Sequence, residues 1–182
     1  THASTVSSDN FSGGQRIGRF LLRGGHERIA YIAGQEESST NQDRESGFLS
    51  ALNEVKVKCW QREVGNYNFE EAAEATRRLM SASEKPDAIF VASDAMAISV
   101  IDTLRNEHNM QIPDDISVVG YDNIPQAAWA AYSLTTMEQQ FTAMIRIAVQ
   151  TLLRQIQADQ VTSESFVLPG DLIVREIGRA HV

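Results

Sequence analysis

The sequence predicts an α/β fold in which a parallel sheet carries helices on both faces. Short apolar runs that suit strands alternate along the chain with longer stretches that suit helices, an order typical of right-handed β–α–β crossovers. One of these runs, 88–92, is apolar at every position, as expected for a strand covered on both faces. These observations indicate a sheet whose strands are parallel and mostly buried.

The elements follow one another in a regular order up to Asp122, after which the pattern is less regular. The predicted strands cover residues 4–7, 28–33, 57–64, 88–92, 116–120, 134–137, 166–169 and 172–174. The predicted helices cover residues 13–22, 43–55, 69–82, 95–107 and 139–156.

Local signals support these elements in order. The first helix places Ile17, Phe20 and Leu21 on one face, and two glycines shortly after it favour its end. Gly34 ends the second strand, and a polar loop leads from there into the second helix. Residues 57–64 alternate like a half-buried strand. Pro113 punctuates the approach to the strand at 116–120, and a Pro-Gly pair at 169–170 predicts a turn between the last two strand pieces.

The helix at 139–156 is strongly amphipathic. Eight apolar side chains fall at helical spacing along it: Phe141, Met144, Ile145, Ala148, Val149, Leu152, Leu153 and Ile156. Each large apolar side chain left in water forgoes roughly 1.5–3 kcal/mol. We therefore expect this stripe to be covered, either by a second chain, by a fold-back of this chain, or by further N-terminal sequence.

The bulk composition indicates a globular protein without a membrane span. The 182 residues are 42% apolar, and no apolar run approaches the roughly 20 residues that cross a bilayer. The formal net charge of −8 repels phosphate, so we do not expect a nucleic-acid groove on these residues themselves. The single Cys59 cannot form an internal disulfide, and the first residues lack the pattern of a signal peptide. We expect a cytoplasmic protein with a structural thiol.

Polar and aromatic residues gather where predicted strands end. Arg44, Tyr67, the pair Ser93-Asp94 and Asp122 all follow strands, and ligands of open parallel sheets bind beyond the carboxyl ends of the strands. Each residue also has a structural alternative. Asp94 could cap the next helix, Asp122 could belong to a turn, Arg44 could lie in solvent, and Tyr67 could pack at the rim. Their convergence on one rim favours a binding site.

Catalytic and metal sites find little support in the sequence. It contains no Gly-x-Ser-x-Gly elbow, no Walker loop, and no Gly-x-Gly-x-x-Gly after a strand. The histidines are scattered without metal-ligand spacing, at His2, His26, His108 and His181. We expect no enzyme activity, no metal and no cofactor, and an unrelated α/β enzyme is the least favoured alternative.

Taken in order, the motifs resemble the effector-binding core of the lac repressor (LacI/GalR) family over nearly the whole chain. The most specific block is Pro113-Asp114-Asp115-Ile116-Ser117-Val118-Val119-Gly120-Tyr121-Asp122. The remaining blocks are Val6-x-x-Asp9-Asn10 with Gly13-Gly14, Gly25-His26-x-Arg28-Ile29-Ala30, Arg44-x-x-Gly47-Phe48, Pro86-Asp87-Ala88-Ile89-Phe90, Ser93-Asp94-x-Met96-Ala97, Leu134-Thr135-Thr136, Leu168-Pro169 and Leu172-x-Val174-Arg175. The chain departs from the family pattern at Tyr132, where a proline is frequent, and at Ile177, where the family closes on Ser.

The resemblance implies a two-subdomain fold like that of periplasmic sugar-binding proteins, with an effector in the cleft between the subdomains. Residues 1–10 and 137–162 would be a remnant of the N-terminal subdomain together with the crossover segments. Residues 11–136 and 163–182 would form the C-terminal effector-binding subdomain. A DNA-binding headpiece is expected to be absent from this chain, in agreement with its acidic charge.

The resemblance also assigns effector contacts. Arg44 would donate hydrogen bonds to ligand hydroxyl or carboxylate groups, Asp122 would accept hydrogen bonds from the ligand, and Tyr67 would form an aromatic wall. Ser93 stands where many members place an Asn that touches the effector. The remaining candidates are Gln139 and Phe141 from the other subdomain and, with less support, Asp9. An Asp acceptor, an Arg donor and aromatic walls suit the hydroxyls and apolar face of a sugar, although a nucleoside-like effector is also open.

Two further expectations concern function and assembly. A repressor that controls operator DNA is favoured, and a periplasmic sugar-binding protein of a transporter is the alternative with the same fold. In repressors of this type, surfaces of the C-terminal subdomain form a two-fold interface. We expect a homodimer through Met96, Val100 and Leu104 with Trp129 nearby, the alternative being that this stripe packs on the chain's own sheet.

Overall fold

The computed structural model describes residues 3–158 and 162–177. Its strands are β1 (Thr5–Ser8), β2 (Ile29–Ala33), β3 (Arg62–Val64), β4 (Ala88–Val91), β5 (Ser117–Asp122), β6 (Thr135–Glu138), β7 (Ser165–Leu168) and β8 (Leu172–Ile173). Its helices are α1 (Asn10–Arg23), α2 (Ser39–Glu54), α3 (Phe69–Met80), α4 (Asp94–His108) and α5 (Phe141–Ala158), with a 3-10 helix η1 at Pro125–Ala128.

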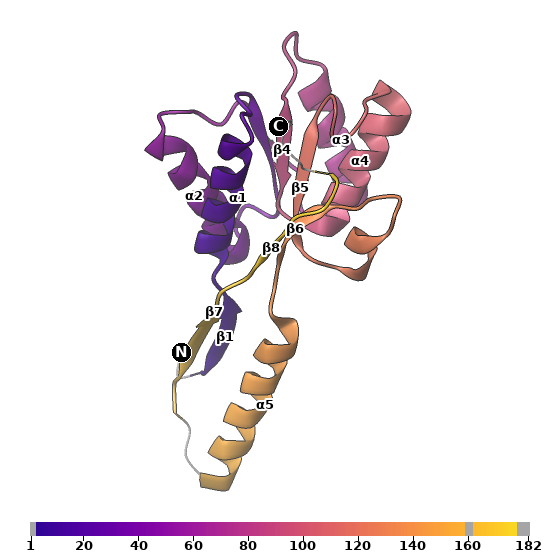
Figure 1. The fold of residues 1–182 in the computed structure, drawn as a ribbon. Helices are drawn as coiled ribbons and strands as arrows, with labels where there is room; N and C mark the ends of the chain where they lie inside the picture. Colours follow the sequence, from indigo (N-terminus) through magenta and orange to yellow (C-terminus); the bar gives the residue numbers. More distant parts are fainter. Residues whose placement is uncertain (1–2, 159–161, 178–182) are drawn as a thin grey trace.

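These elements form a large and a small part, each with its own sheet (Figure 1). The large sheet has six strands in the order β3-β2-β4-β5-β6-β8, and the small sheet pairs β1 with β7. The described pairs are parallel except for β6 with β8, which is antiparallel. The α/β class with a parallel sheet, predicted from the sequence, is confirmed.

Helices cover both faces of the large sheet. α1 and α2 pack together on one side and α3 and α4 on the other (Figure 1). The central strands β2 and β4 are consequently buried at every residue. The rings of Tyr31, Phe48 and Phe90 contact one another in the core between β2, α2 and β4, with centroids 5.1 to 5.6 Å apart. This core fixes the strand ends against the helices that follow them.

Two glycines allow α1 and α2 to approach backbone to backbone. A Cβ atom at Gly14 would lie 2.0 Å from the carbonyl oxygen of Arg44, and a Cβ atom at Gly47 would lie 1.9 Å from that of Phe11. A side chain at either position would push the helices apart. The glycines therefore fix the position of α2, the helix that carries Arg44, relative to α1.

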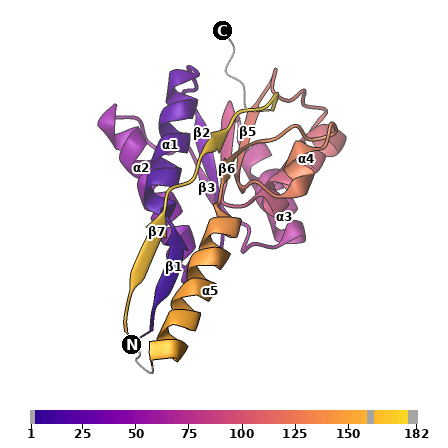
Figure 2. The same ribbon diagram turned by 60° about the horizontal axis from the view of Figure 1, so that its bottom comes forward.

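The small part consists of β1, β7 and α5, and α5 lies beside β1 (Figure 2). The division predicted from the sequence placed 163–182 in the large part, but residues 165–168 pair with residues 5–8 of the small part, whereas β8 pairs with β6. Residues 178–182 lie outside the described residues. The chain thus passes between the two parts after Ser8, after Glu138 and after Leu168.

The apolar stripe of α5 is exposed in this single chain. Phe141, Ile145, Val149 and Leu152 are 49%, 64%, 50% and 58% exposed. Beside them, a cavity of about 470 Å³ lies between β1 and α5. One of the covers expected from the sequence was a fold-back of this chain over the stripe. For the described residues, this prediction is wrong. No helix within 3–158 and 162–177 is long and apolar enough to cross a membrane.

The prediction that a stripe of α4 contacts a second chain is also wrong. Met96, Val100 and Leu104 are all 0% exposed because this face of α4 packs on the chain's own sheet. A side chain buried in the core cannot contact a second chain. Trp129, by contrast, is 56% exposed and remains available.

The strand expected at 57–64 is shorter than predicted. β3 contains only Arg62–Val64, because the N–H of Val57 still bonds to the carbonyl oxygen of Leu52 in the turn after α2, and the bonds to β2 start at Trp60. Cys59 is half-buried in this connection, and burial raises the pKa of its thiol to about 11. A thiol with so high a pKa is a poor nucleophile, in agreement with a structural role.

Candidate functional site

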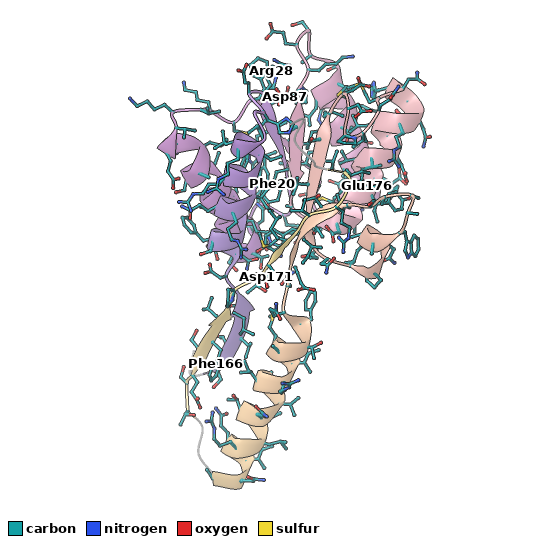
Figure 3. All side chains as sticks on the ribbon, in the orientation of Figure 1. Phe20, Arg28, Asp87, Phe166, Asp171 and Glu176 are labelled. Carbon is teal, nitrogen blue, oxygen red and sulfur yellow. The ribbon has the colours of Figure 1, made fainter. Side chains whose placement is uncertain are left out.

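The two ends of the large sheet differ in what they carry. At the end farther from the small part, Asp87 accepts bonds from the backbone N–H groups of Glu27 and Arg28 and holds the start of β2 (Figure 3). At the other end, the carboxyl ends of the parallel strands face the junction with the small part. Binding sites of open parallel sheets lie at this second end, and Arg44, Asp122 and Gln139 meet there.

Arg44 is the most buried charged side chain of this group. It projects from α2 and is 3% exposed. Its Nε donates to Asn10 Oδ1 at 2.9 Å, and its Nη1 donates to the carbonyl oxygen of Ala92. The guanidinium also lies over the ring of Tyr121, with Cζ 3.7 Å from the ring centroid, in a cation–π contact. Arg44 is thus held in one orientation before any ligand is present.

Asp122 completes an ion pair with this arginine. Its Oδ1 lies 3.2 Å from Arg44 Nη2, and its side chain is 20% exposed. Burial raises the pKa of this carboxyl above its ordinary value, although Arg44 and Gln139 favour the charged form. Asp122 has a φ of +120°, a backbone conformation that costs free energy for a non-glycine residue. The residue at the end of β5 is therefore held in an unusual conformation that presents its carboxylate to the junction.

Gln139 connects this ion pair to the small part. Its Nε2 donates to Asp122 Oδ1 at 2.5 Å, and its Oε1 accepts from Ser8 Oγ at 2.8 Å. Ser8 ends β1 and Gln139 follows β6, so the bonds join two crossings between the parts. A ligand that binds to Asp122 would therefore act on groups that set the position of the small part.

Tyr67 forms part of the rim. It has a φ of +57°, and its ring packs on Gly34, where a Cβ atom would lie 2.1 Å from Tyr67 Cζ. Burial is the main cause of the raised pKa of its hydroxyl, and the charges of Arg44 and Asp122 also act on it. Tyr67 thus lies near the ion pair, as the sequence predicts, and its ring is fixed by contact with a bare glycine.

Two of the other three predicted contacts have structural roles in this chain. Ser93 caps α4 by accepting from the N–H of Met96 at 3.4 Å, and Asp9 caps α1 by accepting from the N–H of Ser12 at 3.0 Å. Phe141, at the start of α5, is half-exposed. These three residues lie on elements that border the junction, and their contacts with an effector remain predictions.

The structure also adds residues that the sequence did not indicate. Asn10 and Tyr121 orient Arg44, and Ser8 orients Gln139. Tyr121 is adjacent to Asp122 in the sequence and Ser8 is adjacent to Asp9, but nothing in a single sequence pairs Asn10 with a residue 34 positions away.

Asp94 is a further residue of this site, and it does not cap the following helix, which was the structural alternative considered from the sequence. Ser93 caps the helix, and Asp94 is 0% exposed. Its carboxylate accepts from Thr136 Oγ1 at 2.6 Å and from the N–H of Ile124 at 2.9 Å. Burial is the main cause that raises the pKa of Asp94 to about 7, and the charge of Asp122 adds to it.

Metal chemistry has no candidate in the part of the chain that the structure describes, since no group of three or more His, Cys, Asp or Glu side chains could hold an ion there. The charged groups at the junction are an arginine and carboxylates. They can bond hydroxyl, amide or carboxylate groups of a small molecule.

Comparisons with known proteins agree with this geometry. The model of the periplasmic binding protein-like domain family matches residues 19–176. The HTH-type transcriptional repressor PurR of Mannheimia succiniciproducens is 30% identical over 174 residues, which cover 94% of this chain and 52% of that protein. The chain spans about half the length of the curated relatives it matches.

Two solved structures have the same fold. The transcriptional regulator CelR in complex with cellobiose is 30% identical, with a TM-score of 0.90, and the match covers 97% of this chain and 54% of that one. A dimeric lac repressor with a C-terminal deletion is 25% identical, also with a TM-score of 0.90, and the match covers 100% of this chain and 66% of that one.

Proposed function

We propose that this chain, which belongs to the periplasmic binding protein-like domain family, is the effector-binding part of a bacterial LacI-type repressor. The effector is a small sugar-like or nucleoside-like molecule. It lies between the large and small parts, against Arg44 and Asp122. Its binding controls the affinity of the repressor for operator DNA.

The observation that carries this proposal is the buried Arg44–Asp122 pair at the carboxyl end of the sheet. A pair of this kind offers fixed donors and acceptors at once, which suits the vicinal hydroxyls of a sugar or the ring edge of a nucleobase. Tyr67 adds an aromatic face beside it. Because Gln139 bonds to both Asp122 and Ser8, a ligand bound to Asp122 would favour one relative position of the large and small parts over others.

The names of the relatives favour regulation over transport or catalysis. Two of the proteins named above are repressors and one is a transcriptional regulator, so a transporter's binding protein has less support. We propose that the protein is not an enzyme, works in the cytoplasm, and reads operator DNA through a separate helix-turn-helix segment. The formal net charge of −8 agrees with a division of labour in which these residues do not bind DNA themselves.

Calorimetry with cellobiose, ribose and hypoxanthine tests the site. At least one compound should bind the wild-type protein, and its binding should be lost in the Asp122→Asn variant. The Asp171→Asn variant is the matched control, because Asp171 is 68% exposed and belongs to a surface ion pair. If these compounds and a thermal-shift panel of other sugars and nucleobases all fail to bind, the proposed function is wrong.

We further propose that the protein is a homodimer through a face centred on α4. Phe69 and Trp129 are 49% and 56% exposed, and both border this helix. Ser99 Oγ donates to the carbonyl oxygen of Phe69 at 2.6 Å, and Arg105 donates to the carbonyl oxygen of Ala131, close to Trp129, at 2.6 Å. Between them on α4 lies Ile98, which is half-buried, and we call Phe69, Ile98 and Trp129 the α4 face. Exposed aromatic anchors flanking a helix suit a self-complementary interface with a second copy.

A further inference from the structure

Asp94 lies beside the effector-contact residue Asp122 and is fully buried. A Cβ atom at Gly120 would lie 2.1 Å from Asp94 Oδ1, so the bare glycine provides the space that the carboxylate fills. Because Ser93 caps α4, the side chain of Asp94 is not occupied by the helix end. Its bonds go to other elements instead, and these bonds suggest its role.

The bonds of Asp94 hold the turn that presents Asp122. Asp122 and Asn123 have φ values of +120° and +55°. Asp94 Oδ2 accepts from the N–H of Ile124, immediately after these two residues. Asp94 Oδ1 accepts from Thr136 Oγ1, which itself accepts from the N–H of Asn123 at 3.3 Å. Backbone in the left-handed region persists only where neighbouring groups hold it, and Asp94 supplies two of these restraints.

The charged groups around the turn favour the neutral form of Asp94. Asp122 faces it from β5, and its negative charge opposes a second one. Arg44 forms its ion pair with Asp122, while Arg175 and Glu138 bond to Asn123. From β6, Thr136 contributes a neutral hydroxyl. A fully buried and a partly buried carboxylate thus lie close together, and Arg44 is paired with Asp122.

We propose that Asp94 is a positioning residue for the effector site and that effector binding is coupled to the uptake of a proton by its carboxylate. This inference rests on the proposed function of the Arg44–Asp122 site and adds the proton as a second ligand of that site. The residue acts through the turn and does not touch the effector.

The geometry decides where the proton goes. The N–H of Ile124 can only donate, so Asp94 Oδ2 must remain an acceptor. The Thr136 hydroxyl can rotate and accept, so the proton binds to Oδ1 and the Asp94–Thr136 bond reverses its direction. No covalent bond other than the new O–H forms or breaks, and the proton comes from solvent. Both states of Asp94 therefore hold Ile124, but only one of them places a second negative charge beside Asp122.

The sign of the coupling follows from desolvation. Asp122 is 20% exposed, and an effector that covers it removes the water that remains around the two carboxylates. Loss of water disfavours two adjacent negative charges, and protonation of Asp94 removes one of them while Asp122 stays charged for the effector. Since the complex then holds more protons than the free protein, effector affinity should increase as the pH falls from 8 to 6.

The first test needs no effector. Carbon-13 NMR of the Asp94 carboxyl group, together with the amide signals of Asn123 and Ile124, is recorded between pH 5 and 9. We expect the carboxyl group to titrate near neutral pH, the two amides to follow with the same midpoint, and both changes to disappear in the Asp94→Asn variant. A carboxyl midpoint below pH 5, or amides that do not follow it, overturns the proposal.

The second test measures the coupling itself. Calorimetry at pH 6, 7 and 8, in two buffers of different ionisation enthalpy, uses whichever of cellobiose, ribose and hypoxanthine binds best. Wild-type affinity should fall about threefold to tenfold from pH 6 to pH 8, with proton uptake on binding. The Asp94→Asn variant mimics the protonated form and should bind equally well at all three pH values.

The outcomes separate this inference from the function on which it rests. A wild-type affinity that does not change with pH, or a folded Asp94→Asn variant that does not bind, contradicts the coupling. If none of the compounds binds the wild-type protein, the proposed function fails, and the NMR titration still decides whether Asp94 controls the turn.

Discussion

Arg44 Nη2 and Asp122 Oδ1 lie 3.2 Å apart, although Arg44 belongs to α2 and Asp122 to the end of β5. The arginine is held from other directions as well, by Asn10, by the carbonyl oxygen of Ala92 and by the ring of Tyr121. A pair fixed on rigid elements in this way needs little reorganisation when a ligand arrives, so its bonds add directly to affinity and specificity.

Removal of this arginine should affect both binding and stability. The Arg44→Ala variant should bind its effector more weakly by about 2 kcal/mol or more, because a buried polar partner is lost. It should also be less stable by about 3 kcal/mol, because Asp122 is left without its cation. Calorimetry and urea unfolding measure the two effects. The Arg77→Ala control breaks only an exposed pair with Glu107 and should change stability by less than about 1 kcal/mol.

The bare glycine under Tyr67 gives a second prediction. A methyl group at Gly34 would lie 2.1 Å from Tyr67 Cζ, so the Gly34→Ala variant should displace this ring and weaken effector binding about tenfold or more. The control is the double variant with Tyr67→Ala, in which the methyl group has room. If Gly34→Ala weakens binding equally with and without Tyr67, the ring is not the reason.

The sequence predicted the fold and the rim of the site because both depend on local rules. Helical periodicity and strand ends are visible in a single sequence, and Arg44, Tyr67 and Asp122 follow from the position of strand ends in a parallel sheet. The stripe of Met96, Val100 and Leu104 was misassigned because an apolar face looks the same whether it packs on its own sheet or on a partner.

Other features depend on tertiary contacts that no local pattern encodes. Ser93 and Asp94 are both good helix caps, and only packing leaves the cap to Ser93 and buries Asp94 beside Thr136. Likewise, the sequence of β7 predicts a strand but does not indicate which of the two sheets the strand joins. Its pairing with β1 is set by the path of the chain through the junction.

The buried Asp94 should also make stability depend on pH. In the unfolded chain an Asp has a pKa of about 3.9, whereas in the folded protein the pKa of Asp94 is raised to about 7. The folded state binds more protons between these values, so this residue's contribution to stability is present at low pH and is lost as the pH rises toward 7. Above pH 7, the charged Asp94 lowers the free energy of unfolding by at most about 4 kcal/mol.

Urea unfolding of the Asp94→Asn variant from pH 5 to pH 8 measures this contribution. Relative to wild type, the variant should gain stability as the pH rises, whereas Asp171→Asn, which alters an exposed carboxylate, should track wild type. A difference between Asp94→Asn and wild type that is constant over this range would mean that Asp94 stays in one protonation state.

The α4 face should be required for dimer formation. The Trp129→Glu and Phe69→Glu variants place a charge in the centre of the proposed interface, and burying an unpaired charge is costly. Sedimentation should therefore show a shift from dimer to monomer in both. Trp60→Glu is the control, since Trp60 is also exposed, at 41%, but precedes β3 near the start of β2. Sedimentation of Trp129→Glu that is identical to wild type would count against this face.

The stripe on α5 should be covered by other polypeptide in the working protein. Six apolar side chains on this helix are at least 49% exposed in the single chain: Phe141, Ile145, Val149, Leu152, Leu153 and Ile156. Roughly 1.5–3 kcal/mol is available for burying each of them fully, so a partner surface is strongly favoured. We expect a second chain, or further sequence of the same protein, to cover it.

Hydroxyl-radical footprinting of the purified protein measures this cover. After each rate is divided by the intrinsic reactivity of its side-chain type, Phe141, Ile145, Val149 and Leu152 should react more slowly than Val174, an exposed residue of the large part that serves as the internal reference. The Ile145→Glu variant should lower stability or disrupt the assembly, because its charge would be buried under the cover. If all four residues react as fast as Val174 in a stable, monodisperse monomer, the helix has no partner, and the burial expected from its amphipathic pattern is wrong.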